Sequence, residues 1–380
     1  MNILASKMRI ALIHDLFVSG ASRCAQDLRR ELGRKHEVCY IPRSELDVGS
    51  VERVLGALED FKPRIVNCHS FFSHLPYDFL STVANLYPTC FTLHDPRPIG
   101  TMGTPCWDCR ENSTCRNCPL LASQWRRMLR NPYYNERKYK RRTHEKCPSS
   151  LRVLCPSQWL IDRLAEHELR RFSLHHIPHG IDIDHFRRRA NSRDRFGLPA
   201  ESPVILFVSS YESRRAINSR KGLPDLAEAF ERYVLPKCPN ATLAVAGDAF
   251  APNHARVKPL GIVSYEHLPE LYSAGDVYVT PTLADNLPYT VLEAMAVESP
   301  VVASKVGGIP EQVVDGETGI LIPPSNPLAI GNAILEILLD PARARMMGLN
   351  GRRRVEKMFS LHQFIGSYEQ IFHEMALTFS

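Results

Sequence analysis

Short apolar runs alternate with amphipathic segments along almost the whole chain. The runs are continuous and rich in β-branched residues, which is typical of strands buried on both faces of a parallel sheet. Ten such strands are expected, at residues 9–13, 38–41, 65–68, 90–93, 153–155, 176–177, 204–208, 243–246, 277–280 and 301–303. Helical periodicity at residues 25–32 and 226–233 falls between them. Strands that alternate with helices predict an α/β protein with parallel sheets.

Two sets of strands in one chain predict two doubly wound, Rossmann-like domains facing across a cleft. The polar stretch 187–203 is the expected link, so the domains are placed at residues 1–195 and 196–359. Residues 360–376 form a last helix, which Ser360 and Gln363 would open as a capping box. We expect ligands at the carboxyl ends of the strands, in the crevice between the domains.

Composition and charge narrow the function classes. With 44% apolar and 23% charged residues, the 380-residue chain is neither disordered nor a small disulfide scaffold. No apolar run reaches about 18 residues, and the first residues lack a secretory layout, so a cytoplasmic location is expected. The net charge is +11 over residues 1–200 and −5 over residues 201–380. The first half therefore favours an anionic partner, whether nucleic acid, a phospholipid surface or a phosphorylated substrate.

The segment DNLPYTVLE, residues 285–293, is the richest candidate site. It follows an expected strand and opens a helix at residues 291–297, with the N–H groups of Tyr289 and Thr290 directed out of the helix start. Such a start favours an anion, and Asp285 and Glu293 offer carboxylates to sugar hydroxyls. Two structural interpretations stay open, a capping box of Thr290 with Glu293 and an Asx-turn at Asp285.

Cations, a histidine and a glycine stand in other loops after expected strands. The stretch RRAINSRKG places Arg214, Arg215, Arg220 and Lys221 at one strand end, where they suit a diphosphate or form a solvated loop. His94 closes CFTLHD with Asp95 and either donates to a substrate oxygen or bonds a neighbouring loop. Gly20 lets the backbone approach a ligand closely, although no G-x-G-x-x-G motif surrounds it.

A cluster of four of the eleven cysteines has the spacing C-x2-C-x5-C-x2-C. Paired knuckles suit a structural Zn site, although the five-residue spacer is short for one, and free or redox-active thiols are the alternative. The four residues are Cys106, Cys109, Cys115 and Cys118.

A strongly basic stretch follows the cysteines. Residues 125–146 carry nine Lys and Arg against two Glu, with Trp125, Tyr133, Tyr134 and Tyr139 interleaved. The stretch suits an anionic membrane surface or another polyanion, and a solvated helix face is the alternative.

The second half resembles the donor-binding domain of the family-4 retaining glycosyltransferases, which have the GT-B fold. The resemblance rests on VYVTPTLADNLPYTVLEAMAVESPVVASKVGGIPEQVVDGETGILIPP, with PSQW and IPHGIDIDHF resembling the segment before the linker. Gly20 stands at the first position of the family's Gly-Gly pair, with Ala21 at the second. The DNLP motif, TLHD and the cysteines after it resemble a branch acting in bacterial surface-polysaccharide assembly.

The resemblance implies roles for these residues. Asp285 stands where most members have the first Glu of E-x7-E and would face the donor sugar, with one methylene fewer. Glu293 would hold the ribose hydroxyls, and Lys221 with Arg215 or Arg220 would hold the diphosphate. His94 would lie near the sugar and the acceptor. Asn286, Leu287, Tyr289 and Thr290 complete the donor segment, and no catalytic metal is implied.

The expected function is transfer of a sugar, with retained configuration, from a nucleoside diphosphate sugar to an acceptor hydroxyl. Residues 1–195 would bind a glycan or lipid-linked acceptor, at the inner face of the cell membrane, and residues 360–380 would pack back on them. Residues 196–359 would bind the donor. Alternatives are an inactive nucleotide-sugar-binding or scaffold protein and, from another class, a zinc-containing nucleic-acid-binding protein, which leaves the second half unexplained.

Overall fold

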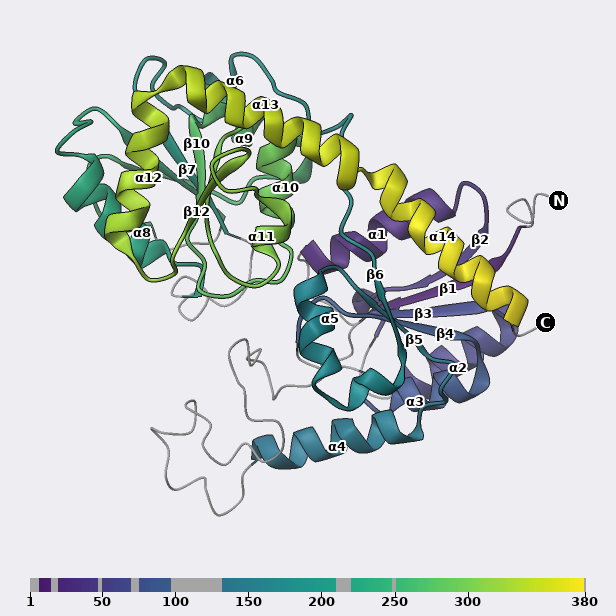
Figure 1. The fold of residues 1–380 in the computed structure, drawn as a ribbon. Helices are drawn as coiled ribbons and strands as arrows, with labels where there is room; N and C mark the ends of the chain where they lie inside the picture. Colours follow the sequence, from purple (N-terminus) through teal and green to yellow (C-terminus); the bar gives the residue numbers. More distant parts are fainter. Residues whose placement is uncertain are drawn as a thin grey trace. The chain divides into compact units, whose positions relative to one another are not determined.

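The structure is a computed structural model that describes residues 7–14, 20–46, 50–69, 75–96, 132–209, 220–247 and 251–378. The chain divides into two compact units, each with its own parallel sheet (Figure 1). Unit 1 comprises Met1–Pro178 with Ile365–Ser380, and unit 2 comprises His179–Phe364.

The division between the units falls before the stretch that the sequence singled out as the link. Ile181 is bridged to Ser360, and the buried side chains of Phe186 and Leu198 belong to a core cluster of unit 2. Residues 187–203 therefore lie within unit 2, because Phe186 just before the polar stretch and Leu198 within it pack into its core.

Unit 1 is built on a six-stranded parallel sheet in the order β2-β1-β3-β4-β5-β6. The chain runs from β1 outward to β2 and then returns to the other side of β1, so the strand order reverses between β1 and β3. At this point His14 and His69, the last residues of the two strands, are register partners. The strands are β1 Arg9–His14, β2 Glu37–Ile41, β3 Ile65–His69, β4 Thr89–Thr92, β5 Arg152–Cys155 and β6 Ser173–His176.

Helices cover both faces of the first sheet. Apolar side chains of α2, α3 and α5 pack with Val66, Phe91 and Val153 in one core cluster. The opposite face meets α14, where the Cys90 thiol donates to Met375 Sδ at 3.1 Å. The helices are α1 Gly20–Leu32, α2 Ser50–Phe61, α3 Phe79–Leu86, α4 Pro132–Lys146, α5 Gln158–Ala165 and α14 Leu361–Thr378.

Unit 2 has a second six-stranded parallel sheet, in the order β12-β11-β10-β7-β8-β9. Its strand order reverses between β7 and β10, which are neighbours although β8 and β9 separate them in sequence. The strands are β7 Val204–Val208, β8 Thr242–Ala246, β9 Val257–Gly261, β10 Val277–Thr280, β11 Val301–Ser304 and β12 Gly319–Ile322.

Two clusters of buried side chains form the core of unit 2, each on one face of the sheet. One combines strand residues with α9, α10, α11 and α13, and the other with α8, the π-helical segment Phe230–Val234 and α12. The helices are α6 Ser192–Arg195, α8 Leu223–Ala229, α9 Leu268–Ala274, α10 Tyr289–Ala296, α11 Ile309–Gln312, α12 Pro327–Leu339 and α13 Pro341–Met358.

The predicted α/β class and the two parallel sheets are confirmed, and all ten expected strands overlap observed ones. Two strands were not predicted, β9 and β12. β9 carries Pro259 and is mostly exposed at the sheet edge, so it lacks the continuous apolar run of a buried strand. Among the described residues, no helix is both long and apolar enough to span a bilayer.

The last helix begins directly after Ser360, and Ser360 and Gln363 bond each other at its start as expected. The Gln363 N–H donates to Ser360 Oγ at 3.3 Å, as in a capping box. The Gln363 amide also donates to the Lys357 carbonyl and accepts from the Ser360 hydroxyl.

Candidate functional site

The loops after β7 and β10 bring the predicted donor-site residues of unit 2 together. Lys221 lies two residues before the start of α8, and Asp285 lies between β10 and α10. Both loops leave the sheet at the carboxyl ends of the two strands between which the strand order reverses. Open α/β sheets bind ligands at this kind of position, because the loops there diverge to opposite faces and leave a crevice.

Lys221 and Asp285 form a close ion pair. Lys221 Nζ lies 2.5 Å from Asp285 Oδ2, and the two side chains are 14% and 17% exposed. Burial by itself would raise the pKa of Asp285. The nearby charges of Lys221 and Arg220 and hydrogen bonds from Lys221 and from the Asn286 N–H outweigh this effect and hold the pKa below its usual range. Asp285 is therefore a carboxylate at neutral pH.

Two glycines permit the close approach of these loops. Gly222, at φ +76°, would place a Cβ 2.0 Å from the Pro281 carbonyl oxygen. Gly307, at φ +56°, would place a Cβ 1.7 Å from the carbonyl oxygen of Asp285. Both positions thus require glycine for conformation and for space.

Further hydrogen bonds fix the same loops. The Arg220 guanidinium donates to the Ala284 carbonyl at 2.8 Å, and the Gly308 N–H donates to the Asn286 carbonyl at 2.7 Å. The backbone around Asp285 is therefore held from two sides, by the segment before α8 and by the segment before α11.

Helix α10 starts two residues earlier than predicted. It begins at Tyr289 after Pro288, which provides no side-chain cap. Thr290 is thus the second helical residue and forms no capping box with Glu293, so that structural interpretation is wrong. The N–H groups of Tyr289 and Thr290 lie in the first turn, where an α-helix supplies no acceptor four residues earlier.

The Asx-turn interpretation is also not what the structure shows. Asp285 Oδ1 accepts from the N–H of the next residue, Asn286, whereas an Asx-turn uses the residue after it. Asn286, Leu287 and Tyr289 are buried and Thr290 is partly exposed.

Glu293 is buried in the second turn of α10 rather than in the first. Its carboxylate accepts a hydrogen bond from the Tyr272 hydroxyl, with Oη 2.7 Å from Oε2. Tyr272 comes from α9 and is itself fully buried. The tyrosine hydroxyl therefore fixes the position of one oxygen and orients the group.

His179 is a residue of this region that the sequence analysis did not single out. Its imidazole stacks on the Tyr289 ring, with centroids 4.6 Å apart and planes 19° apart. Burial lowers the pKa of His179 to about 3, although the nearby Asp285 charge acts in the opposite direction. The imidazole is therefore neutral at physiological pH. Its position in IPHGIDIDHF was the only signal in the sequence.

His94 lies in unit 1, two residues beyond the end of β4 rather than on the strand. Its Nε2 is 3.1 Å from Nδ1 of His69, which closes β3. The sequence did not predict His69 as a site residue. Among the described residues, Cys24, His69 and His94 are one group of possible metal ligands, with one ligand atom of each within 4.8 Å of the others. Gly20 begins α1.

Several predicted residues lie outside the part of the chain that the structure describes. These are Arg214 and Arg215, the cysteines Cys106, Cys109, Cys115 and Cys118, and the basic stretch before residue 132. The rest of that stretch forms α4. Its Lys138, Arg141, Arg142 and Lys146 are exposed, whereas Lys140 is buried with its Nζ 5.7 Å from the centre of the Tyr77 ring.

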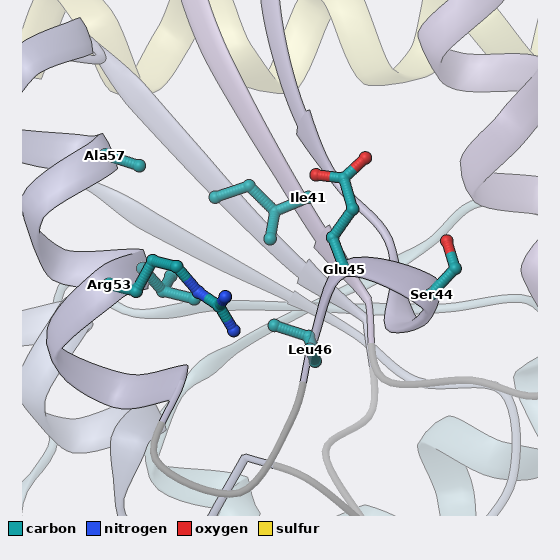
Figure 2. A pocket seen from close by; sticks show the side chains of 7 residues that line it. Ile41, Ser44, Glu45, Leu46, Arg53 and Ala57 are labelled. Carbon is teal, nitrogen blue, oxygen red and sulfur yellow. The ribbon is translucent and has the colours of Figure 1, made fainter.

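A pocket of about 460 Å³ opens in unit 1 at the end of β2 (Figure 2). Glu45 and Arg53 contribute charged groups from different elements, and Ile41, Leu46 and Val54 contribute apolar surface. No residue predicted for the donor site or for acceptor contact lines this pocket.

Two protein families match the chain, one in each half. Residues 40–185 match the family described as Glycosyltransferase Family 4, and residues 202–340 match the family described as Glycosyl transferases group 1. A GDP-mannose-dependent alpha-(1-6)-phosphatidylinositol monomannoside mannosyltransferase of Mycolicibacterium smegmatis is 30% identical over 203 residues. These residues are 47% of this chain and 51% of that protein, so the match spans about half of its length.

Solved structures resemble the chain over nearly its whole length. The sucrose-phosphate synthase of Thermosynechococcus elongatus has a TM-score of 0.74 at 21% identity, covering 98% of this chain and 100% of that one. HepE of Anabaena in complex with UDP-glucose has a TM-score of 0.70 at 16% identity, covering 97% and 100%. Each half of the chain thus matches a glycosyltransferase family, and the shared architecture shows the two-domain GT-B fold.

Proposed function

We propose that the chain transfers a sugar from a nucleoside diphosphate sugar to an acceptor hydroxyl, with retained anomeric configuration. The observation that carries this proposal is the Lys221–Asp285 pair at the strand-order reversal of unit 2, beside the start of α10. Cations, helix N–H groups and a fixed carboxylate suit a ligand with a diphosphate at one end and hydroxyl groups at the other.

Charge on the leaving diphosphate is the main electrostatic demand of the reaction. Lys221 has three N–H donors, of which Asp285 uses one, so the others are available to phosphate oxygens. Arg220 and the first N–H groups of α10 add to the same field, and we propose the same role for Arg215, which lies outside the described residues. These groups stabilise the developing charge without a metal ion, and we propose that no metal is required for catalysis.

The two carboxylates have separate roles in this proposal. Asp285 accepts hydrogen bonds from the hydroxyls of the donor sugar, and Glu293 accepts them from the ribose of the nucleotide. The Tyr272 hydroxyl donates to Glu293 Oε2 and so orients the carboxylate for this role. Asn286, Leu287, Tyr289 and Thr290 form the wall between the two carboxylates.

Unit 1 would bind the acceptor, with His94 near the transferred sugar and Gly20 where the backbone approaches the ligand. Exposed cations on α4 favour an acceptor at an anionic surface, because Lys138, Arg142 and Lys146 face solvent while His144 and Lys140 are buried. The mannosyltransferase relative is named for a phosphatidylinositol acceptor. We infer a phosphate-bearing lipid acceptor at the inner face of the cell membrane, in the assembly of a surface glycan.

The reaction is tested by incubating the chain with UDP-, GDP- and ADP-sugars and a lipid-phosphate acceptor, and by determining the product anomer by NMR. The proposal expects a product with the configuration of the donor. An inverted product would refute retention. If a donor binds but the chain transfers sugar from none of the three donors, the result would instead support an inactive nucleotide-sugar-binding protein.

The membrane proposal is tested by cosedimentation with vesicles of neutral lipid, with and without anionic lipid. Replacing Lys138, Arg142 and Lys146 by Ala should abolish binding to the anionic vesicles. A matched control replaces Arg345, Arg353 and Lys357, which are exposed on α13, and removes the same charge. Equal losses in both triple variants would contradict a specific role for α4.

A further inference from the structure

Buried polar side chains form a hydrogen-bonded chain through unit 1 that ends at His94. The Thr92 hydroxyl donates to Asn67 Oδ1 at 2.9 Å, and Asn67 Nδ2 lies 3.2 Å from His69 Nε2. His69 Nδ1 is 3.1 Å from His94 Nε2. The two ring centroids are 5.4 Å apart with planes at 18°, so the rings meet edge to edge.

The last helix extends this chain at its other end. Tyr368 of α14 places its hydroxyl 3.2 Å from Thr92 Oγ1 and also bonds the Cys24 thiol. Asn67, His69 and Tyr368 are almost completely buried. Burial raises the pKa of Tyr368 well above its usual range, so its hydroxyl keeps its hydrogen.

Each hydrogen in the chain has one direction. The Thr92 hydroxyl gives its single hydrogen to Asn67, so the Thr92 oxygen accepts a hydrogen bond from the Tyr368 hydroxyl. The Tyr368 oxygen in turn accepts a hydrogen bond from the Cys24 thiol. The Asn67 NH₂ group has hydrogens only to donate, so His69 Nε2 accepts. A neutral imidazole that accepts at Nε2 carries its hydrogen at Nδ1, and His69 Nδ1 therefore donates to His94 Nε2.

We propose that Asn67 and His69 are positioning residues that hold His94 in the tautomer with the hydrogen on Nδ1. His94 then presents a permanent N–H donor to its substrate rather than a lone pair. The part of this inference that concerns the substrate rests on the proposed function. Through its hydrogen bond to Thr92, Tyr368 of α14 also helps to fix the direction of the hydrogen bonds that lead to His94.

In the opposite direction His94 Nε2 would carry the hydrogen and donate to His69 Nδ1, and a hydrogen on His69 Nε2 would then point at the Asn67 NH₂ group. If neither of the facing nitrogens carried a hydrogen, two imidazole lone pairs would meet at 3.1 Å. Two acceptors at this distance repel unless a cation lies between them, and the Cys24 thiol would then be a third ligand. The two directions of the hydrogen bond place the His94 hydrogen on different atoms, so one spectrum separates them, and a metal analysis detects a bound cation.

The test is a long-range ¹H–¹⁵N NMR spectrum of the full chain labelled at histidine, which distinguishes protonated from unprotonated ring nitrogens. The His94 signals are assigned from their loss in His94→Gln. We expect the hydrogen on Nδ1. A hydrogen on Nε2, or a stoichiometric metal ion that is lost in Cys24→Ala, would overturn the proposal.

Two variants of His69 separate positioning from folding. The amide nitrogen of Asn has the bond separation from Cβ that Nδ1 has, so His69→Asn keeps a donor toward His94. In His69→Gln the amide group lies where Nε2 was, facing Asn67. Both variants replace the ring by an amide and should lower the melting temperature similarly.

Only His69→Gln should lose the fixed tautomer of His94 and lower kcat by about tenfold, the scale of one good hydrogen bond, with little change in the donor KM. Equal kcat values with different tautomers would overturn the positioning role. Because the spectrum is independent of turnover, a chain without transferase activity would refute the proposed function while leaving the tautomer assignment intact.

Discussion

Removing the cation of the Lys221–Asp285 pair should destabilise unit 2 in a pH-dependent manner. At 2.5 Å and an effective dielectric constant of about 20, the attraction is roughly 6–7 kcal/mol before desolvation is subtracted. Deleting one member of a buried pair costs about 3–5 kcal/mol, because the other charge is left without compensation. Since both side chains keep some exposure, we expect the lower end for Lys221→Met, about 3 kcal/mol, or roughly 6–12 °C in Tm.

The pH dependence follows from the sign of the Asp285 shift. Its folded pKa is lowered, so the pair stabilises the fold above the ordinary pKa of an aspartate, and this contribution is lost as pH falls through the folded pKa. In Lys221→Met the pKa of Asp285 should rise, because burial then outweighs the remaining positive charge. The Tm difference from wild type should therefore be largest near pH 7.5 and should shrink toward pH 4.

Differential scanning calorimetry at the two pH values measures this difference. Arg343→Met is the matched control, because it removes a cation from the exposed Arg343–Glu336 pair in the same unit, and exposed pairs contribute little. A Tm loss in Lys221→Met no larger than in the control, or one that is the same at both pH values, would refute the reasoning about this pair.

Three further variants address the surrounding groups. Gly307→Ala should displace the Asp285 loop, lower Tm and weaken donor binding. The control is Gly316→Ala, because Gly316 has a similar φ, +75°, and its new Cβ would have nothing within 4 Å. The control should only lower Tm. If titration calorimetry finds equal donor affinities, the close approach is irrelevant to the site. His179 has a pKa near 3 in the folded chain, so below its ordinary pKa it takes up a proton on unfolding. The free energy of unfolding of wild type should therefore fall as the pH is lowered from about 6.5 toward 3. In urea titrations His179→Phe should lose less of this free energy over the same range. An unchanged pH slope would contradict the neutral buried state of His179. Tyr272→Phe leaves Glu293 Oε2 without its donor, which should cost about 1–3 kcal/mol in unfolding experiments and weaken nucleotide binding; unaltered affinity would argue against a nucleotide role for Glu293.

Much of the fold was predictable because strands buried on both faces carry an unmistakable apolar run. Val204–Val208 and Val277–Thr280 were predicted at their observed bounds. The exposed edge strand β9 has no such run and was not predicted. Residues 187–203 were predicted to be a linker because they are polar, and polarity along the sequence does not reveal that Phe186 and Leu198 pack into a core.

The candidate site was predictable as a set of residues but not as a set of contacts. Lys221 and Asp285 were both assigned to the donor, yet their pairing depends on two loops that meet only because β7 and β10 are neighbours. Asn67 and His69 lie in a strand whose short sequence gives no hint of polar partners. Their chain reaches Tyr368, which is 276 residues from Thr92 and could be placed only by tertiary structure.

The central claim is that unit 2 holds a nucleoside diphosphate with Lys221 and the groups around it. Isothermal titration of the wild-type chain and of Lys221→Met with UDP, GDP and ADP tests this claim most directly. We expect one nucleotide to bind wild type with a stoichiometry of one, and its affinity to fall at least about tenfold in the variant, since a charge-assisted hydrogen bond contributes about 1.5–3 kcal/mol. Undiminished affinity in the variant, or binding of none of the three nucleotides to wild type, would contradict the account.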